Sequence, residues 1–75
     1  MNNLRNKELL IQFGERVRTL RLASGLTQEE LCYKAEVELS QIYRIEKGKI
    51  NPTLSILAAI ATALEISIAE LLGEL

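Results

Sequence analysis

The chain has 75 residues and a formal net charge of −1, which is enough for one domain with a single small core. It contains no histidine and one cysteine, so a conventional zinc site, histidine-based catalysis and an internal disulfide are excluded. No run approaches the about 18 apolar residues of a membrane span, and the N-terminus has no long apolar signal segment. We therefore expect a single cytoplasmic domain over residues 1–75, without a metal or other cofactor.

The charges are unevenly distributed along the chain. Residues 1–50 hold all nine Lys and Arg against seven Glu, a net charge of +2, whereas residues 51–75 hold three Glu and no basic residue. An anionic partner is therefore expected to bind to the first two thirds of the chain. The last third is apolar and acidic, which suits core packing and self-association.

The hydrophobic periodicity and the capping signals are helical throughout, and no alternating strand pattern appears. The sequences TQEE at 27–30 and SIAE at 67–70 are capping boxes, in which a hydroxyl and a carboxylate satisfy each other's free backbone amides at the start of a helix. These signals predict an all-α fold of five helices over about residues 4–24, 27–35, 39–47, 53–64 and 67–72.

The two short helices within residues 27–48 are the centre of the pattern. Neither is long enough to be stable alone, so the two must pack crosswise on the first and fourth helices. This is helix-turn-helix geometry, and it leaves one face of the third helix free to enter the major groove of DNA. The apolar stripe that joins the pair consists of Leu31, Ala35, Val37, Ile42 and Ile45.

Several short motifs occur in order: LR at 20–21, GLTQEEL at 25–31, IYRIEKG at 42–48, PTL at 52–54 and IATAL at 60–64. Together, from Phe13 to Leu72, the chain resembles the Cro/C1-type helix-turn-helix family of phage repressors and bacterial regulators. The resemblance implies a compact five-helix, lambda-repressor-like fold that binds double-stranded DNA and dimerises. The helix-turn-helix would span about residues 27–47, and residues 53–72 would supply core and dimer contacts.

The outer face of the third helix carries the residues expected to contact bases, because the matching positions of related repressors meet base edges. Arg44 is the principal candidate, since arginine bonded to guanine O6 and N7 is the commonest specific contact. Of the other candidates, Gln41 would contact adenine, Ser40 would contact any of several bases, and Leu39 would contact a thymine methyl group. Leu39 has packing along the turn as its alternative role.

A second group of residues is expected to contact phosphates, which positions a protein without recognising sequence. Thr27 and Gln28 lie at the amino end of the second helix, where backbone amides and the helix dipole attract anions. In the family, the glutamine that matches Gln28 contacts a DNA phosphate. The remaining candidates lie at or beyond the end of the third helix: Tyr43, Lys47, Lys49 and Asn51. For the lysines, a solvated charge is the alternative.

Two further roles concern structure and assembly. The resemblance implies an internal ion pair between Arg21 and Glu46, which would position the third helix. The late apolar residues are candidates for the dimer interface, although the core of the protomer must claim several of them: Ile66, Ile68, Leu71, Leu72 and Leu75.

Two glutamates depart from the family pattern. Glu36 stands where glycine is usual, so either the turn changes its geometry or Glu36 takes a left-handed conformation at a cost of about 1 kcal/mol. Glu38 stands where serine or threonine is usual. Its carboxylate suits the helix dipole but lies close to phosphates, and it would gain a partner by accepting a hydrogen bond from a cytosine amino group.

The leading prediction is a transcription regulator that binds a pseudo-palindromic operator as a homodimer, because one protomer offers too few contacts for high specificity. The small size suits a restriction–modification controller protein or an antitoxin-type autorepressor. The acidic balance, with Glu36 and Glu38, favours the alternative of a protein-interaction module that has lost DNA binding. No catalytic or phosphate-binding motif and no small-molecule site is apparent, so an enzyme is not expected.

Overall fold

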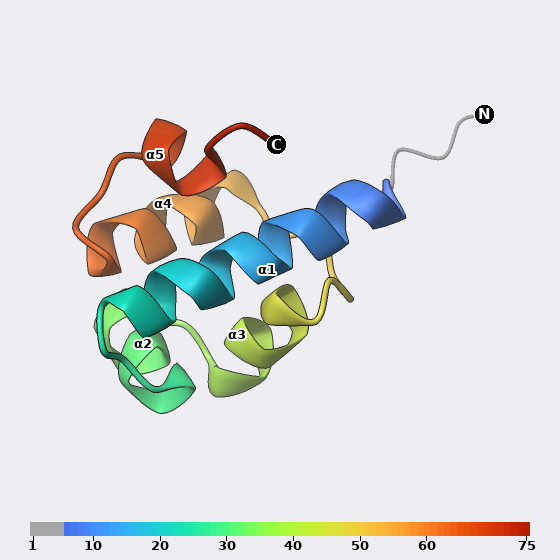
Figure 1. The fold of residues 1–75 in the computed structure, drawn as a ribbon. Coiled ribbons are helices and arrows are strands. Elements are labelled where there is room, and N and C mark those ends of the chain that lie inside the picture. Colours follow the sequence, from blue (N-terminus) through green and yellow to red (C-terminus); the bar gives the residue numbers. More distant parts are fainter. Residues whose placement is uncertain (1–5) are drawn as a thin grey trace.

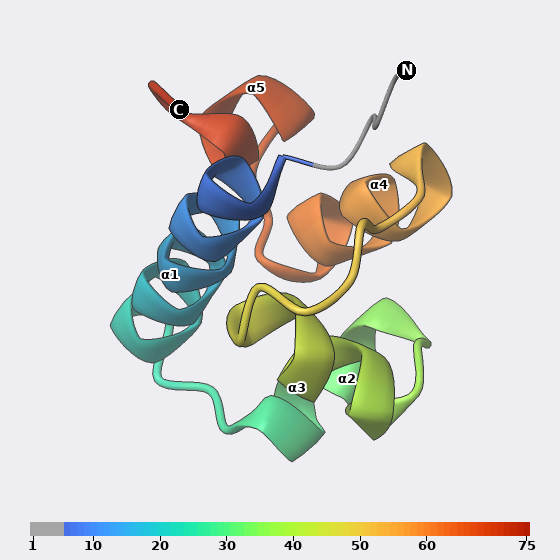
Figure 2. The same ribbon diagram turned by 90° about the vertical axis from the view of Figure 1, so that its right-hand side faces the viewer.

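The computed structural model describes residues 6–75, and this part of the chain is all-helical, as predicted. α5 and the pair α2–α3 lie at opposite ends of the molecule, and α1 runs past both (Figures 1 and 2). None of the helices in this range is long and apolar enough to cross a membrane. The helices are α1 Lys7–Ala23, α2 Gln28–Ala35, α3 Leu39–Glu46, α4 Leu54–Ala63 and α5 Ile68–Leu72.

The first helix begins where a side chain caps it. Asn6 has an extended backbone and accepts a hydrogen bond from the Leu9 amide at 3.0 Å, so Lys7 is the first helical residue. The predicted start at Leu4 lies outside the described residues. Both predicted capping boxes, at the starts of α2 and α5, are present. The residues that cap three of the other helices in the same way are Thr27, Thr53 and Ser67.

Apolar side chains from all five helices fill the core. The stripe predicted across α2 and α3 is buried apart from Val37, which is half-buried. Two large apolar residues at the starts of helices face solvent instead, since Leu9 is 41% and Leu54 is 70% exposed. Both stand in the first turn of a helix, at the edge of the core. The core residues are Phe13, Val17, Leu31, Ala35, Ile42, Ile45, Ile60, Ala61, Ala63, Leu64 and Leu71.

The backbones of α1 and α3 are in direct contact. A Cβ atom on Gly14 would meet the carbonyl oxygens of Ile45 and Glu46, the latter at 2.8 Å. Just after α3, a Cβ atom on Gly48 would lie 2.8 Å from the Cα atom of Ile11. Glycine at both positions therefore allows the end of α3 to lie directly on α1.

The short helix α5 is held by a cation as well as by its apolar side. Arg16, in α1, donates from Nε to the Leu71 carbonyl at 3.1 Å and from Nη2 to the Glu70 carbonyl at 2.6 Å. Carbonyls in the last turn of a helix have no partner within that helix, and a positive charge there interacts favourably with the helix dipole. Arg16 thus fixes α5 against α1, which the sequence alone did not indicate.

Candidate nucleic-acid interface

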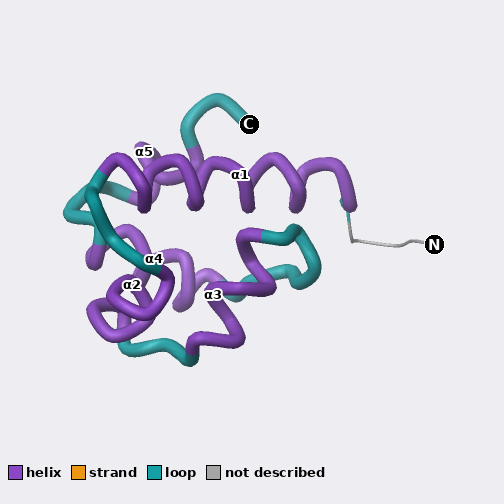
Figure 3. Tube along the Cα trace, turned by 60° about the horizontal axis from the view of Figure 1, so that its bottom comes forward, coloured by secondary structure: helices purple, strands orange, loops and turns teal. Residues whose placement is uncertain are grey.

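Residues 36–38 form the turn between α2 and α3, and Figure 3 shows how short this loop is. Glu36 ends α2 in the left-handed region, with φ 58° and ψ 40°. Its amide donates to the Tyr33 carbonyl at 3.3 Å, and the Val37 amide donates to the Cys32 carbonyl at 3.1 Å. Of the two expectations for Glu36, the strained conformation is therefore the one observed.

The helix α3 has a buried face and a solvent-facing one. Ile42, Ile45 and Glu46 are buried. Residues of an α-helix follow one another at 100°, so Ser40 and Arg44 lie on the opposite side, and both are exposed. The predicted base-contacting face of α3 is consequently open to a partner.

The other two residues predicted to contact bases are placed differently. Leu39, the first residue of α3, is exposed. Gln41 is half-buried, and its Oε1 atom is buried without a hydrogen-bond partner among the described residues. The predicted adenine contact needs that oxygen to accept from the adenine amino group. Gln41 cannot make this contact in the conformation observed.

A buried ion pair joins α1 to the last turn of α3. The Arg21 side chain donates to both carboxylate oxygens of Glu46, at 2.6 Å from Nε and 3.0 Å from Nη2. Arg21 is 6% and Glu46 is 8% exposed, so the predicted pair is present and buried. The hydrogen bonds to Glu46 raise the pKa of Arg21 above its ordinary value, which keeps the guanidinium charged.

The same carboxylate also holds a residue of α2. Gln28 donates from Nε2 to Oε1 of Glu46 at 3.0 Å. A glutamine amide carries a second N–H, so this contact orients Gln28 and leaves one donor for another acceptor. Sequence reasoning missed it because the two residues are 18 positions apart and belong to no shared periodic pattern.

The remaining residues predicted to contact phosphates are exposed: Thr27, Tyr43, Lys47, Lys49 and Asn51. The Thr27 hydroxyl accepts from the Glu30 amide at 3.0 Å and retains its own proton as a donor. The Lys47 ammonium lies 5.7 Å from the centre of the Tyr43 ring, within the range of a cation–π contact. The two side chains therefore form one cationic and aromatic surface at the end of α3.

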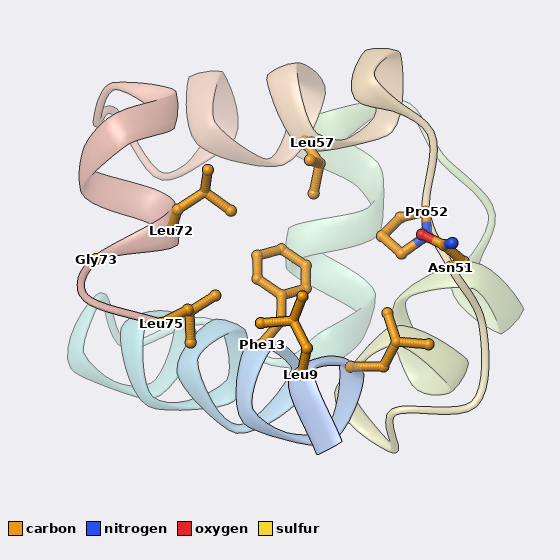
Figure 4. Close-up of a pocket in the computed structure, with 9 residues that line it drawn as sticks. Leu9, Phe13, Asn51, Pro52, Leu57, Leu72, Gly73 and Leu75 are labelled. Atoms are coloured by element: carbon orange, nitrogen blue, oxygen red, sulfur yellow. The ribbon is translucent and has the colours of Figure 1, made fainter. Parts of the chain in front are cut away.

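An apolar groove separates the start of α1 from α4 and the C-terminal end. Phe13 lies between Leu9, Leu57 and Leu72, with Asn51 and Pro52 to one side (Figure 4). Asn51, in the loop that follows α3, therefore lies at the rim of this groove.

The structure corrects one residue of the predicted dimer interface. Leu71 is fully buried in the protomer, because it is the residue of α5 that faces the core, so it offers no surface to a partner. Ile66, Ile68 and Leu72 are half-buried, and Leu75 is 44% exposed. Large exposed hydrophobic side chains that the predicted site did not include are Leu9, Ile11, Leu22, Tyr33 and Leu54.

Comparison with known proteins gives a consistent result. A family profile described as a helix-turn-helix domain matches residues 12–73. The immunity repressor protein of Bacillus phage phi105 is 39% identical over 61 residues, which cover 81% of this chain but only 42% of that protein. Control protein C.BamHI of Bacillus amyloliquefaciens is 33% identical over 72 residues, which cover 95% of this chain and 83% of that protein.

A solved structure matches closely as well. The restriction-modification controller protein C.AhdI from Aeromonas hydrophila is 40% identical to this chain, with a TM-score of 0.81. The alignment covers 83% of this chain and 94% of C.AhdI. The similarity therefore extends over most of both chains.

Proposed function

The chain belongs to the helix-turn-helix family, and we propose that it is a transcription regulator that binds a specific, pseudo-palindromic double-stranded DNA site as a homodimer. The observation that carries the proposal is the exposed face of α3, on which Ser40 and Arg44 stand opposite the buried Ile42 and Ile45. The major groove of B-DNA is about 12 Å wide and admits one α-helix. The exposed face of α3 would meet base edges there.

Base recognition is assigned mainly to Arg44, whose guanidinium would donate to O6 and N7 of a guanine. Ser40 lies one turn earlier on the same face and would contact a neighbouring base. Leu39 would contact a thymine methyl group. Gln41 contributes only after its side chain leaves the half-buried position described above.

Phosphate binding is assigned to both sides of α3. Gln28, held by Glu46, would donate its second N–H to a phosphate beside the start of α2, where the Thr27 hydroxyl and the helix dipole add to the attraction. At and beyond the far end of α3, phosphate contacts would come from Tyr43, Lys47, Lys49 and Asn51.

Dimerisation is assigned to the apolar residues near the C-terminus that remain accessible in the protomer. A dimer would place two α3 helices about 34 Å apart, one turn of DNA, so that both enter the major groove on one face. The residues of the proposed interface are Ile66, Ile68, Leu72 and Leu75.

More specifically, we propose that this regulator is a restriction–modification controller protein that binds DNA in the cytoplasm. C.BamHI and C.AhdI match this chain over 83% and 94% of their own lengths, whereas the phage repressor is more than twice as long as its matched part. A gene for a DNA methyltransferase or a restriction nuclease beside this gene would support the proposal. A neighbouring toxin gene would instead assign the chain to the antitoxin-type autorepressors.

DNA binding itself is tested by selection from a random duplex library, followed by mobility-shift titrations at several salt concentrations. We expect one pseudo-palindromic sequence to be enriched, with an affinity that falls as salt rises because bound phosphates release counterions. If no duplex is retarded even at low salt, the proposal is wrong and a protein-interaction module is favoured.

Replacing Arg44 by alanine tests the assignment of base recognition. The Arg44→Ala variant is expected to lose about 5- to 100-fold in preference at one base pair per half-site, the usual contribution of a bidentate arginine contact. Lys34→Ala removes a comparable exposed charge from α2 and should change affinity for all sequences equally. Selection experiments on both variants measure this, and an unchanged site preference in Arg44→Ala would refute the assignment.

A further inference from the structure

The start of α3 differs from the starts of the other helices in the described part of the chain. Four helices have a short polar N-cap whose side chain accepts a backbone hydrogen bond: Asn6, Thr27, Thr53 and Ser67. The N-cap of α3 is Glu38, and its side chain makes no such bond. The carboxylate of Glu38 is therefore not used for capping.

The backbone of Glu38 is nevertheless well fixed. It is extended, with φ −73° and ψ 148°, and its carbonyl accepts from the amides of Gln41 at 3.0 Å and Ile42 at 3.3 Å. Its side chain is exposed, as are the next two residues, Leu39 and Ser40. The carboxylate thus lies in solvent at the N-terminal end of α3, the end whose residues contact base edges when a recognition helix lies in the major groove.

A carboxylate in the major groove has few favourable partners. It repels phosphates, and it can only accept hydrogen bonds. Guanine O6 and N7 and thymine O4 are acceptors, and the adenine amino group lies beside the acceptor N7. The adenine amino group also has thymine O4 on its other side, whereas the cytosine N4 amino group has an acceptor, guanine O6, on one side only, so a carboxylate favours cytosine over the other three bases.

We propose that Glu38 is a specificity-determining residue that accepts a hydrogen bond from a cytosine N4 group and weakens binding to all other sequences. The proposal rests on the entry of α3 into the major groove, which is the proposed function. Glu38 and Arg44 are six residues apart, roughly 9 Å along the helix axis and about 120° apart around it. The two side chains would therefore contact different base pairs.

The test compares the wild-type chain with Glu38→Ala and Glu38→Gln, by selection from a random duplex library and by titration of the selected and unrelated duplexes. Wild-type protein should require cytosine at one position per half-site. In Glu38→Ala, this preference should fall about tenfold or more, while affinity for unrelated duplexes rises because a negative charge is lost. In Glu38→Gln, the preference should move towards adenine, which an amide can bind with both its oxygen and its nitrogen.

The matched control is Glu36→Gln, which neutralises a carboxylate two residues away in the same turn. It should raise affinity for all duplexes equally and leave the base preference unchanged. If Glu38→Ala behaves like this control, the role of Glu38 is general repulsion and the inference is overturned. If the wild-type chain selects no sequence, the proposed function fails as well, so the two failures are distinguishable. Circular dichroism of each variant establishes that it is folded.

Discussion

The carboxylate of Glu46 connects three helices through two other side chains. The carboxylate accepts two hydrogen bonds from Arg21 in α1 and one from Gln28 in α2, and Glu46 itself is the last residue of α3. A buried pair of this kind contributes little net stability compared with apolar residues of similar size, because both charges lose their hydration. Removal of one partner alone is costly, since the other charge remains buried.

Neutralising this carboxylate should separate stability from DNA binding. Glu46→Gln is expected to lower the free energy of unfolding by about 3 kcal/mol, because it leaves Arg21 buried without its counter-charge. The double variant Arg21→Met with Glu46→Leu should recover most of this stability and still bind DNA weakly, since Gln28 has no partner to orient it. Urea unfolding and DNA titration of both variants measure the two effects. Full DNA affinity in a stable double variant would contradict the role given to Gln28.

The left-handed turn residue offers a second test at this scale. Glu36 has a φ of 58°, a conformation that costs about 1 kcal/mol for a residue with a Cβ atom and little for glycine. Glu36→Gly is therefore expected to raise the free energy of unfolding by up to about 1 kcal/mol. Glu29→Gly, within α2, should lower it by a similar amount because glycine is a poor helix former. Chemical denaturation compares them, and destabilisation by Glu36→Gly would show that the turn is not strained.

At the scale of the elements, the five helices were predictable because their signals are local. A capping box such as Thr27 with Glu30 and a glycine after a helix act within a few residues, so the sequence contains the whole interaction. The burial of Leu71 and the exposure of Leu54 were not predictable in this way. Each depends on which helix packs against it, and the apolar periodicity of one helix does not specify its neighbours.

The same limit applied to the candidate site. The outward direction of Arg44 follows from the positions of Ile42 and Ile45, which periodicity supplies. The half-buried position of Gln41 follows from the same periodicity, because Gln41 stands four residues before the buried Ile45. The contact between Gln28 and Glu46 depends instead on how α3 crosses α2. Gly14 illustrates the point, because a glycine within α1 is unfavourable locally and is explained only by the backbone of α3 beside it.

Replacing Gly14 by alanine should have two opposing effects on the stability of the fold. Alanine improves helix propensity by up to about 1 kcal/mol, but its Cβ atom would meet backbone carbonyls of α3, and overpacking typically costs about 1–3 kcal/mol. The carbonyls cannot rotate away, so we expect net destabilisation and a fall of several degrees in Tm. Thr19→Ala, at an exposed position of α1, is the control and should be neutral or stabilising. A higher Tm for Gly14→Ala would mean that α3 can move from α1 without loss.

At the scale of the whole molecule, the proposed dimer has a consequence for DNA spacing. One extra base pair between the half-sites moves one of them by about 3.4 Å and rotates it by roughly 35°. We expect at least tenfold weaker binding of the selected operator after this insertion. An insertion of ten base pairs restores the rotation but not the distance, so binding should stay weak. Equal affinity for all three duplexes would show that the protomers bind independently.

Two arginine contacts of α1 explain why the spacing between the operator half-sites should be strict. Arg16 holds α5, and Arg21, five residues later, holds α3 through Glu46, so a single continuous helix connects the proposed dimer interface to the base-contacting helix. This arrangement separates two routes of evolutionary change. A new base preference requires only a substitution on the exposed face of α3, such as at Ser40, and leaves the fold untouched. A new operator length requires coordinated changes where α1 meets both of its neighbours, so relatives of this protein should diverge in operator sequence far sooner than in operator length.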